Sequence, residues 1–280
     1  MGCINSNQGF KHWFGNIHLS GPCNRSCYFC IGQHMLVLDS LNNLNRFPLK
    51  NLDSFIERCK KHGIYEINLT GSNTDPLLYR HIGELHLYLK SHIPDLIFGI
   101  RTNGVLSELR KNDLKYFNKG SLSIHSFNKD IYKKMMGIGA PPDLEKILPH
   151  YRHFSSLKLN IVLGLENTID DLLETIKIAM KYNFQKVNLR EPYGQAHIGD
   201  PLAKAGFIAS ELTFGMPTYS IGGLKVTYWD VHFVEVESVN LYANGVISED
   251  YSVTRGCDPK DGTVIPQEKW TAGRHYKQWV

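Results

Sequence analysis

A cysteine loop lies directly after the first predicted strand. It reads CNRSCYFC over residues 23–30 and follows the β-rich run 16–20. Three thiols within eight residues can converge on one site, and thiolates are the natural ligands of iron–sulfur clusters. A cubane cluster has four irons, so three cysteines leave one iron without a protein ligand. We therefore expect Cys23, Cys27 and Cys30 to hold a metal centre with one open position.

Zinc is the alternative for the same loop. His34 lies four residues after Cys30, so a Cys3His zinc site is chemically conceivable. Structural zinc sites, however, normally draw their ligands from two separated pairs, whereas these four residues lie within twelve positions. The other cysteines, at positions 3, 59 and 257, are isolated. This pattern is not a disulfide framework and indicates a reducing compartment.

Short β-rich runs alternate with helical patterns along the first 200 residues, which predicts βα units and a parallel sheet. Strands are expected at 16–20, 65–70, 96–101, 121–126, 157–163 and 186–190. Helices are expected near 51–62, 81–92, 107–118, 141–153 and 168–182. The predicted fold class is α/β, a partial (β/α)6 TIM-like barrel. In such barrels the chemistry lies at the carboxyl ends of the strands.

The alternation of predicted strands and helices ends near residue 200. A β-rich run covers 224–240, and Asn244-Gly245 lies between the β-rich runs 239–243 and 246–253, which predicts a type I′ hairpin. We therefore expect two parts: a core barrel over 1–200 and a β-rich C-terminal extension over 201–280. The extension would cap the barrel or serve its substrate side.

The composition limits the classes of partner. The 280 residues are 42% hydrophobic and 21% charged, with a net charge of +4, which is typical of a globular protein without a dense basic stripe for nucleic acid. No apolar run reaches the roughly 18 residues of a spanning helix, and no signal peptide is visible. We expect a cytoplasmic protein without a nucleic-acid or membrane partner. The alternative is a membrane anchor, because Met1-Gly2-Cys3 begins an N-myristoylation pattern.

The spacing Cys-x3-Cys-x2-Cys, with an aromatic residue before the last cysteine, resembles the signature of the radical S-adenosylmethionine (SAM) superfamily. The resemblance extends over residues 16–191 through matching strand ends. It implies one [4Fe–4S] cluster on the three cysteines, whose open iron binds SAM. It also implies cleavage of SAM to methionine and a 5′-deoxyadenosyl radical that abstracts hydrogen from a substrate. The cofactor carries this chemistry, and a flavodoxin- or ferredoxin-like protein would supply the electron.

The same resemblance implies which residues contact SAM. Residues 70–77 depart from the family's Gly-Gly-Glu-Pro segment, with Asp75 in place of the glutamate, and 101–104 resemble its Thr-Asn-Gly turn. A plain turn is the alternative at both places. His125 is expected to be structural. The implied SAM contacts are Gly71, Ser72, Asp75, Asn103, Ser123, Ser126, Val162, Asn167 and Leu189, the last through its backbone.

Two residues are candidates for the substrate side. Arg190 ends the sixth predicted strand, where a guanidinium can hold a carboxylate or phosphate; an ion pair with Glu191 is the alternative. Cys257 is a candidate hydrogen donor, and an isolated loop thiol is its alternative. Fold does not select the substrate. We expect a small molecule or a peptide, with modification of tRNA or another RNA as the alternative. A non-catalytic barrel with structural zinc is the non-enzyme alternative.

Overall fold

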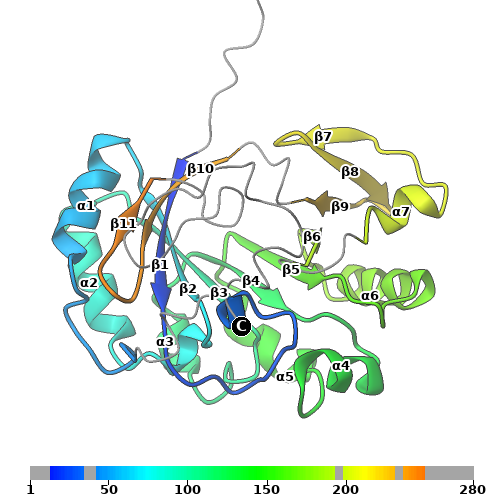
Figure 1. Cartoon of the computed structure of the whole chain (residues 1–280), viewed down its shortest axis with the longest axis horizontal. Coiled ribbons are helices and arrows are strands. Elements are labelled where there is room, and N and C mark those ends of the chain that lie inside the picture. Colours follow the sequence, from blue (N-terminus) through cyan, green and yellow to red (C-terminus); the bar gives the residue numbers. More distant parts are fainter. Residues whose placement is uncertain (1–12, 35–41, 193–197, 231–235, 250–280) are drawn as a thin grey trace, which may run out of the picture.

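The computed structural model describes residues 13–34, 42–192, 198–230 and 236–249. Its frame is one open, curved sheet of eleven strands (Figure 1). The strand order is β11-β10-β1-β2-β3-β4-β5-β6-β9-β8-β7. Within the run from β10 to β9 in this order, each strand is parallel to the next. β11, β8 and β7 are antiparallel additions at the two edges.

The strands have the following bounds. They are β1 (Trp13–Leu19), β2 (Glu66–Gly71), β3 (Ile97–Thr102), β4 (Lys119–Ser123), β5 (Ser156–Val162), β6 (Lys186–Arg190), β7 (Glu211–Thr213), β8 (Met216–Ile221), β9 (Leu224–Trp229), β10 (Glu237–Leu241) and β11 (Ile247–Ser248). The six strands predicted for the barrel are therefore confirmed, with small shifts at their ends. The fourth shifts most, since β4 ends at Ser123 instead of residue 126.

Helices cover the outer face of the sheet, as α1, α2 and α6 show most clearly in Figure 1. The α-helices are α1 (Leu52–Lys61), α2 (Ile82–His92), α3 (Lys111–Leu114), α4 (Lys129–Met136), α5 (Leu144–Ile147), α6 (Ile169–Lys181) and α7 (Pro201–Lys204). Short 3-10 helices are η1 (Ile31–His34), η3 (Pro76–Leu78) and η4 (Leu148–Tyr151).

Helix α6 follows directly from its sequence. The Thr168 side chain accepts a hydrogen bond from the Asp171 backbone N–H at 3.2 Å and caps the first turn. Leu172, Ile176 and Ala179 recur on one face and are all buried. An amphipathic helix of this kind gains most of its stability from packing its apolar face against the sheet.

Two of the predicted helices differ from the structure. The segment 141–153 divides into α5 and η4, because Pro149 lacks the backbone N–H that would continue the α-helical ladder. The segment 107–118 is helical only at α3. Helix α4 lies outside the five predicted segments, since eight residues are too few for a clear period. Its N-cap is Asn128, whose side chain accepts from the Asp130 backbone N–H at 2.9 Å.

The Asn244-Gly245 hairpin is present, but its turn is not type I′. A type I′ turn needs positive φ at both central residues, whereas Gly245 has φ 88° and Asn244 is not among the positive-φ residues. The backbone N–H of Gly245 donates to the Tyr242 carbonyl at 2.8 Å, which closes a turn ahead of the glycine. The Asn244 side chain holds this conformation by accepting from the Val246 N–H at 3.0 Å. The second strand is short, and residues from 250 onward lie outside the described part.

Strands that follow residue 200 extend the barrel sheet at both of its edges. β9 pairs in parallel with β6, and β10 pairs in parallel with β1. The partial barrel is thus confirmed, and two further parallel strands join its six. The division of the chain at residue 200 stays a prediction.

The two faces of the sheet differ sharply in polarity. Side chains that face the helices are apolar and fully buried, among them Ile67, Leu159, Ile161, Val187 and Leu189. The inner face instead carries amides that bond to one another: Asn188 Nδ2 donates to Asn160 Oδ1 at 3.1 Å, and Asn16 Nδ2 donates to Asn240 Oδ1 at 2.8 Å. A closed barrel normally fills its interior with branched apolar side chains. This barrel has a polar interior that leaves room for ligands.

Candidate active site: a cysteine pocket at the strand ends

The cysteine loop lies over the carboxyl ends of the parallel strands. Cys23, Cys27 and Cys30 all line one cavity of about 270 Å³, which we call the cysteine pocket. Cys27 Sγ lies 3.4 Å from Met136 Sδ, and Cys30 Sγ lies 3.7 Å from the carbonyl oxygen of Ser72. The loop is thus held against the end of α4 and the turn after β2.

The surroundings of the thiols disfavour bare thiolates. Burial, reinforced by the neighbouring thiols of Cys30 and Cys23, raises the pKa of Cys27 to about 12. Burial also raises the pKa of Cys23. A bound metal cation favours the thiolate instead, because a thiol that coordinates a metal is deprotonated. The pocket therefore suits metal-bound thiolates better than free ones.

The donor set fits a cluster better than a single ion. Within the described ranges, no three His, Cys, Asp or Glu side chains converge as a mononuclear metal site requires. A [4Fe–4S] cluster instead takes each thiolate on a different iron, so its ligands are spread apart. The zinc alternative also needs the side chain of His34, which lies outside the described part. The three thiols that line the pocket are the donor set that such a cluster takes.

The turn after β2 brings one unsatisfied polar atom, the Ser72 hydroxyl oxygen, to the pocket. A Cβ atom at Gly71 would collide with the carbonyl oxygen of Thr74, so this close turn requires glycine. Ser72 is only 3% exposed, and its hydroxyl has no hydrogen-bond partner in the described structure. Buried polar groups are normally satisfied. The Ser72 hydroxyl is therefore available for a polar ligand.

Asp75 lines the same pocket, but its carboxylate is already engaged. Its oxygens accept from the Leu77 N–H at 3.0 Å, the Asn103 N–H at 2.8 Å and the Thr102 hydroxyl at 2.8 Å. Burial raises the pKa of Asp75, while these hydrogen bonds act to lower it. In the structure, the Asp75 carboxylate links the turn after β2 to the turn after β3 through these hydrogen bonds.

Three more of the residues expected to contact SAM line the pocket: Asn103, Ser123 and Val162. Asn103 Nδ2 donates to Asn24 Oδ1 at 2.7 Å, which ties the end of β3 to the cysteine loop. The backbone N–H of Val162 donates to His125 Nδ1 at 2.8 Å. His125 is only 2% exposed, so it is a satisfied structural histidine that also lines the pocket wall.

The structure does not bring Ser126, Asn167 or Leu189 into the pocket lining. The Ser126 hydroxyl donates to Asp171 Oδ1 at 2.6 Å, and Asn167 Nδ2 donates to Asp171 Oδ2 at 2.9 Å. Both side chains are therefore held at the start of α6. Leu189 lies on the apolar face of β6 and is fully buried, with its backbone in register with β5 and β9. Strand alternation points its side chain away from the interior.

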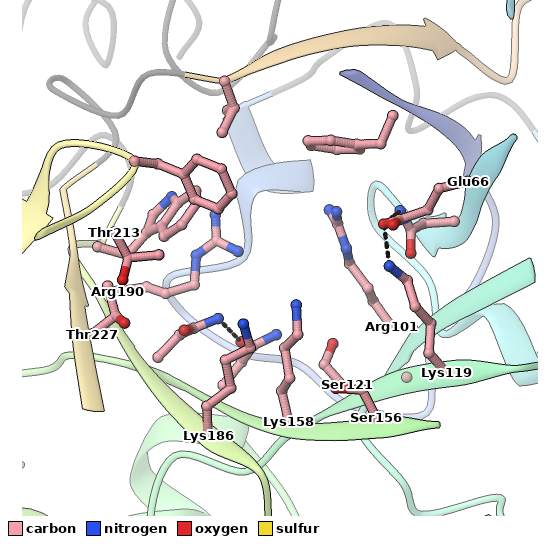
Figure 2. Close-up of a pocket in the computed structure, with 18 of the residues that line it drawn as sticks. Glu66, Arg101, Lys119, Ser121, Ser156, Lys158, Lys186, Arg190, Thr213 and Thr227 are labelled. Atoms are coloured by element: carbon pink, nitrogen blue, oxygen red, sulfur yellow. Dashed lines mark hydrogen bonds and ion pairs between the residues drawn. The ribbon is translucent and has the colours of Figure 1, made fainter. Parts of the chain in front are cut away.

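Arg190 reaches the interior from the end of β6. It lines the cysteine pocket and also a second cavity in the barrel interior (Figure 2). Its guanidinium lies 5.7 Å from the ring centre of Trp229. The adjacent Glu191 carboxylate accepts from the Gly199 N–H at 3.0 Å and the Tyr228 hydroxyl at 3.1 Å. Cys257, the other substrate-side candidate, lies outside the described residues.

Residues 17–179, more than half of the chain, match the model of the Radical SAM superfamily. The chain belongs to the radical SAM superfamily. Membership of this family implies a [4Fe–4S] cluster and SAM, in agreement with the donor set of the cysteine pocket.

Curated relatives of this radical SAM chain are named as GTP 3′,8-cyclases. A probable GTP 3′,8-cyclase of Thermococcus kodakarensis is 27% identical over 183 residues, which cover 63% of this chain and 56% of the relative. A GTP 3′,8-cyclase of Helicobacter pylori is 26% identical over 174 residues, covering 60% of this chain and 52% of the relative. The alignments thus span about half the length of these relatives.

Solved structures confirm the fold class. SuiB of Streptococcus suis superposes with a TM-score of 0.53 at 12% identity, covering 84% of this chain and 59% of SuiB. SuiB bound to S-adenosylmethionine gives a TM-score of 0.52 at the same identity, covering 84% of this chain and 57% of that one. No helix in the described part of this radical SAM chain is long and apolar enough to cross a bilayer.

Several pocket residues of the radical SAM chain were not singled out from the sequence. His18 and Arg25 both line the cysteine pocket. Burial lowers the pKa of His18 to about 4, and its ring stacks on Tyr242 at 4.9 Å. Arg25 Nε donates to the Tyr132 hydroxyl at 3.1 Å. The inward direction of alternate strand residues could have indicated His18, but the partner Tyr242 lies more than 200 residues away.

Proposed function

We propose that this chain is a radical SAM enzyme that binds one [4Fe–4S] cluster through Cys23, Cys27 and Cys30. The observation that carries the proposal is that these thiols share one pocket with the carboxyl ends of β2, β3, β4 and β5. When bound, the cluster supplies one electron that cleaves SAM to methionine and a 5′-deoxyadenosyl radical, which abstracts hydrogen from a substrate. The protein positions the reactants and keeps water out.

Different pocket residues contact different parts of SAM. The Ser72 hydroxyl, which is buried without a partner, accepts from the amino group of SAM. Asn103 and Ser123 line the wall that receives its carboxylate and ribose, and Val162 supplies an apolar contact for the adenine ring. Asp75 acts indirectly, because it holds the turn that carries Asn103. Gly71 permits this arrangement, since a larger residue would push the turn apart.

The substrate enters from the polar interior, where Arg190 lines both cavities and can hold an anionic group. A small molecule or a peptide fits this position. The curated relatives act on GTP by their names, which supports a small molecule. A flavodoxin- or ferredoxin-like protein supplies the electron, and a reducing cytoplasm suits the cluster.

The test is the production of 5′-deoxyadenosine by protein whose cluster has been reconstituted without oxygen. Dithionite-reduced protein is mixed with SAM, and 5′-deoxyadenosine and methionine are measured by mass spectrometry. The proposal expects both products in equal amounts, even without substrate, as slow uncoupled cleavage. Protein that carries iron and sulfide but forms neither product would refute it.

A further inference from the structure

A second cavity lies inside the barrel (Figure 2). It has a volume of about 390 Å³ and is strongly cationic. We call it the basic chamber and define it by Arg101, Lys119, Lys158, Lys186 and Arg190. Glu66 is the single carboxylate among its described lining residues. Lys158 and Lys186 face each other across neighbouring strands in this chamber, and like charges so placed are unfavourable unless a ligand supplies negative charge.

The strand register places lysines side by side. Lys158 on β5 lies directly opposite Lys186 on β6, which lies opposite Lys225 on β9. Neighbouring strands are about 4.8 Å apart, and like charges that face each other across strands are destabilising. The formation of the sheet does not explain why three lysines lie side by side, since lysine does not favour strand formation.

The lysines at the two ends of this region are neutralised by carboxylates. Lys119 forms an ion pair with Glu66, and Lys225 forms one with Glu211 at 2.6 Å. The structure gives no such ion pair to Lys158 or Lys186 within the described ranges. Figure 2 shows both of these side chains directed into the chamber.

The pKa values of Lys158 and Lys186 are lowered, as expected for lysines without a carboxylate partner. Burial, followed by the charges of Lys186, Lys119 and Arg101, lowers the pKa of Lys158 to about 7. Burial and the neighbouring lysines also lower the pKa of Lys186. Glu66 acts in the opposite direction on Lys158, but it is already paired with Lys119.

Neutral hydrogen-bond donors line the same chamber without partners. The Ser121 hydroxyl on β4 and the indole Nε1 of Trp229 on β9 are both buried and unsatisfied in the described structure. Ser121 is only 6% exposed. Two orphaned donors beside two unneutralised ammonium groups match an acceptor-rich anion.

The chamber is continuous with the candidate site of radical chemistry. Arg101, Asn160 and Arg190 line both the basic chamber and the cysteine pocket. A molecule held by the lysines therefore extends toward the pocket at the strand ends. Aromatic rings keep the two guanidiniums in place, because Arg101 lies 5.6 Å from the Phe14 ring centre and Arg190 lies 5.7 Å from that of Trp229.

We propose that the basic chamber binds the phosphate or polyphosphate group of a small-molecule substrate, with Lys158 and Lys186 as its main contacts. This inference rests on the proposed function and deepens it by naming the substrate class. A group with one negative charge would leave one of the two lysines unneutralised, whereas a phosphate supplies two charges and three acceptor oxygens. A cavity of about 390 Å³ inside the barrel selects a small molecule over a nucleic-acid strand.

The test measures binding of inorganic tripolyphosphate to the reconstituted protein by isothermal titration calorimetry. We expect the Lys158→Ala/Lys186→Ala double variant to bind about tenfold more weakly or worse. Lys225→Ala is the matched control, because Lys225 is in register with Lys186 but is paired with Glu211 and 63% exposed; it should bind like the wild type. Binding at neutral pH should also take up protons in the wild type, as the anion restores the charge of Lys158.

Several results would overturn the inference. They are absent binding by the wild type, equal binding by the double variant, equal affinity for citrate, or tighter lysine-dependent binding of a single-stranded RNA. A thermal melt of each variant shows that it is folded. Calorimetry needs no turnover, so it is independent of 5′-deoxyadenosine formation. Wild-type protein that binds tripolyphosphate through these lysines but never cleaves SAM would refute the proposed function alone; the reverse would refute the phosphate site alone.

Discussion

Cys30 Sγ lies 3.7 Å from the carbonyl oxygen of Ser72, so the cysteine loop after β1 contacts the turn after β2. The two segments are more than 40 residues apart in sequence. They meet because β1 and β2 are parallel neighbours whose carboxyl ends lie together. This contact places the proposed cluster ligands beside the unsatisfied hydroxyl of Ser72.

Replacing Cys27 should abolish cluster assembly. Cys27→Ala removes one of three thiolates, and two cannot hold a cluster that already has an open iron. After anaerobic reconstitution, we expect iron and sulfide near zero and no brown colour. Cys59→Ala is the control, because Cys59 is fully buried in α1 and lies outside the pocket. Equal iron content in the two variants would contradict the assignment of Cys27.

Asp75 should contribute to stability as well as to the site. Asp75→Ala leaves the buried N–H groups of Leu77 and Asn103 without their acceptor, which should lower the free energy of unfolding by about 3 kcal/mol. Urea denaturation measures the change. The comparison is Asp143→Ala, which removes an exposed cap from α5 and should lose about 1 kcal/mol. Similar losses in both variants would show that the Asp75 network is weak.

Acid should destabilise the fold through its buried histidines. Burial lowers the pKa of His125 to about 3 and that of His18 to about 4. Both are thus neutral in the folded chain but gain a proton below about pH 6.5 in the unfolded one. The unfolded state then binds more protons, so the free energy of unfolding should fall as the pH drops from about 6.5 toward 4.

The His125→Gln variant tests this assignment. A glutamine oxygen can accept from the Val162 N–H, as the imidazole does, but it does not titrate. Denaturation curves between pH 4 and 7 should therefore show a shallower loss of stability in the variant. A slope equal to that of the wild type would mean that His125 is not held neutral in the fold.

How far the sequence predicts this molecule depends on the distance between interacting residues. The cysteine loop, Gly71 and Asn103 were predicted from short local patterns, because carboxyl ends of parallel strands gather at one edge. The pairing of β10 with β1 was not predicted, because it joins segments that lie more than 200 residues apart in the sequence. The position of the Ser126 side chain also escaped prediction, because its hydroxyl donates to Asp171, which lies 45 residues further along the chain.

The basic chamber could not be predicted from the sequence either. A single lysine at the start of a strand has the sequence pattern of a solvent-exposed residue. Only the register shows that Lys158 and Lys186 face each other within the barrel. The depressed pKa of Lys158 then depends on burial and on neighbouring charges that the sequence does not place.

Removing Lys158 should stabilise the protein in the absence of ligand. Lys158→Met relieves repulsion with Lys186, which should raise the melting temperature by about 2–4 °C at pH 6.5 if the gain is about 1 kcal/mol. The pKa of Lys158 is about 7 in the fold and higher when unfolded, so the gain should shrink as the pH rises above 7. Lys225→Met should not gain, since it loses an ion pair with Glu211. A lower melting temperature for Lys158→Met would contradict the repulsion.

The most direct test of the account is electron paramagnetic resonance of the reduced cluster with and without SAM. A cluster held by Cys23, Cys27 and Cys30 alone has one iron that SAM can bind, so adding SAM should change the shape of the signal. We expect this change in the wild type. An iron–sulfur signal that SAM leaves unaltered, or reconstituted protein without such a signal, would contradict it.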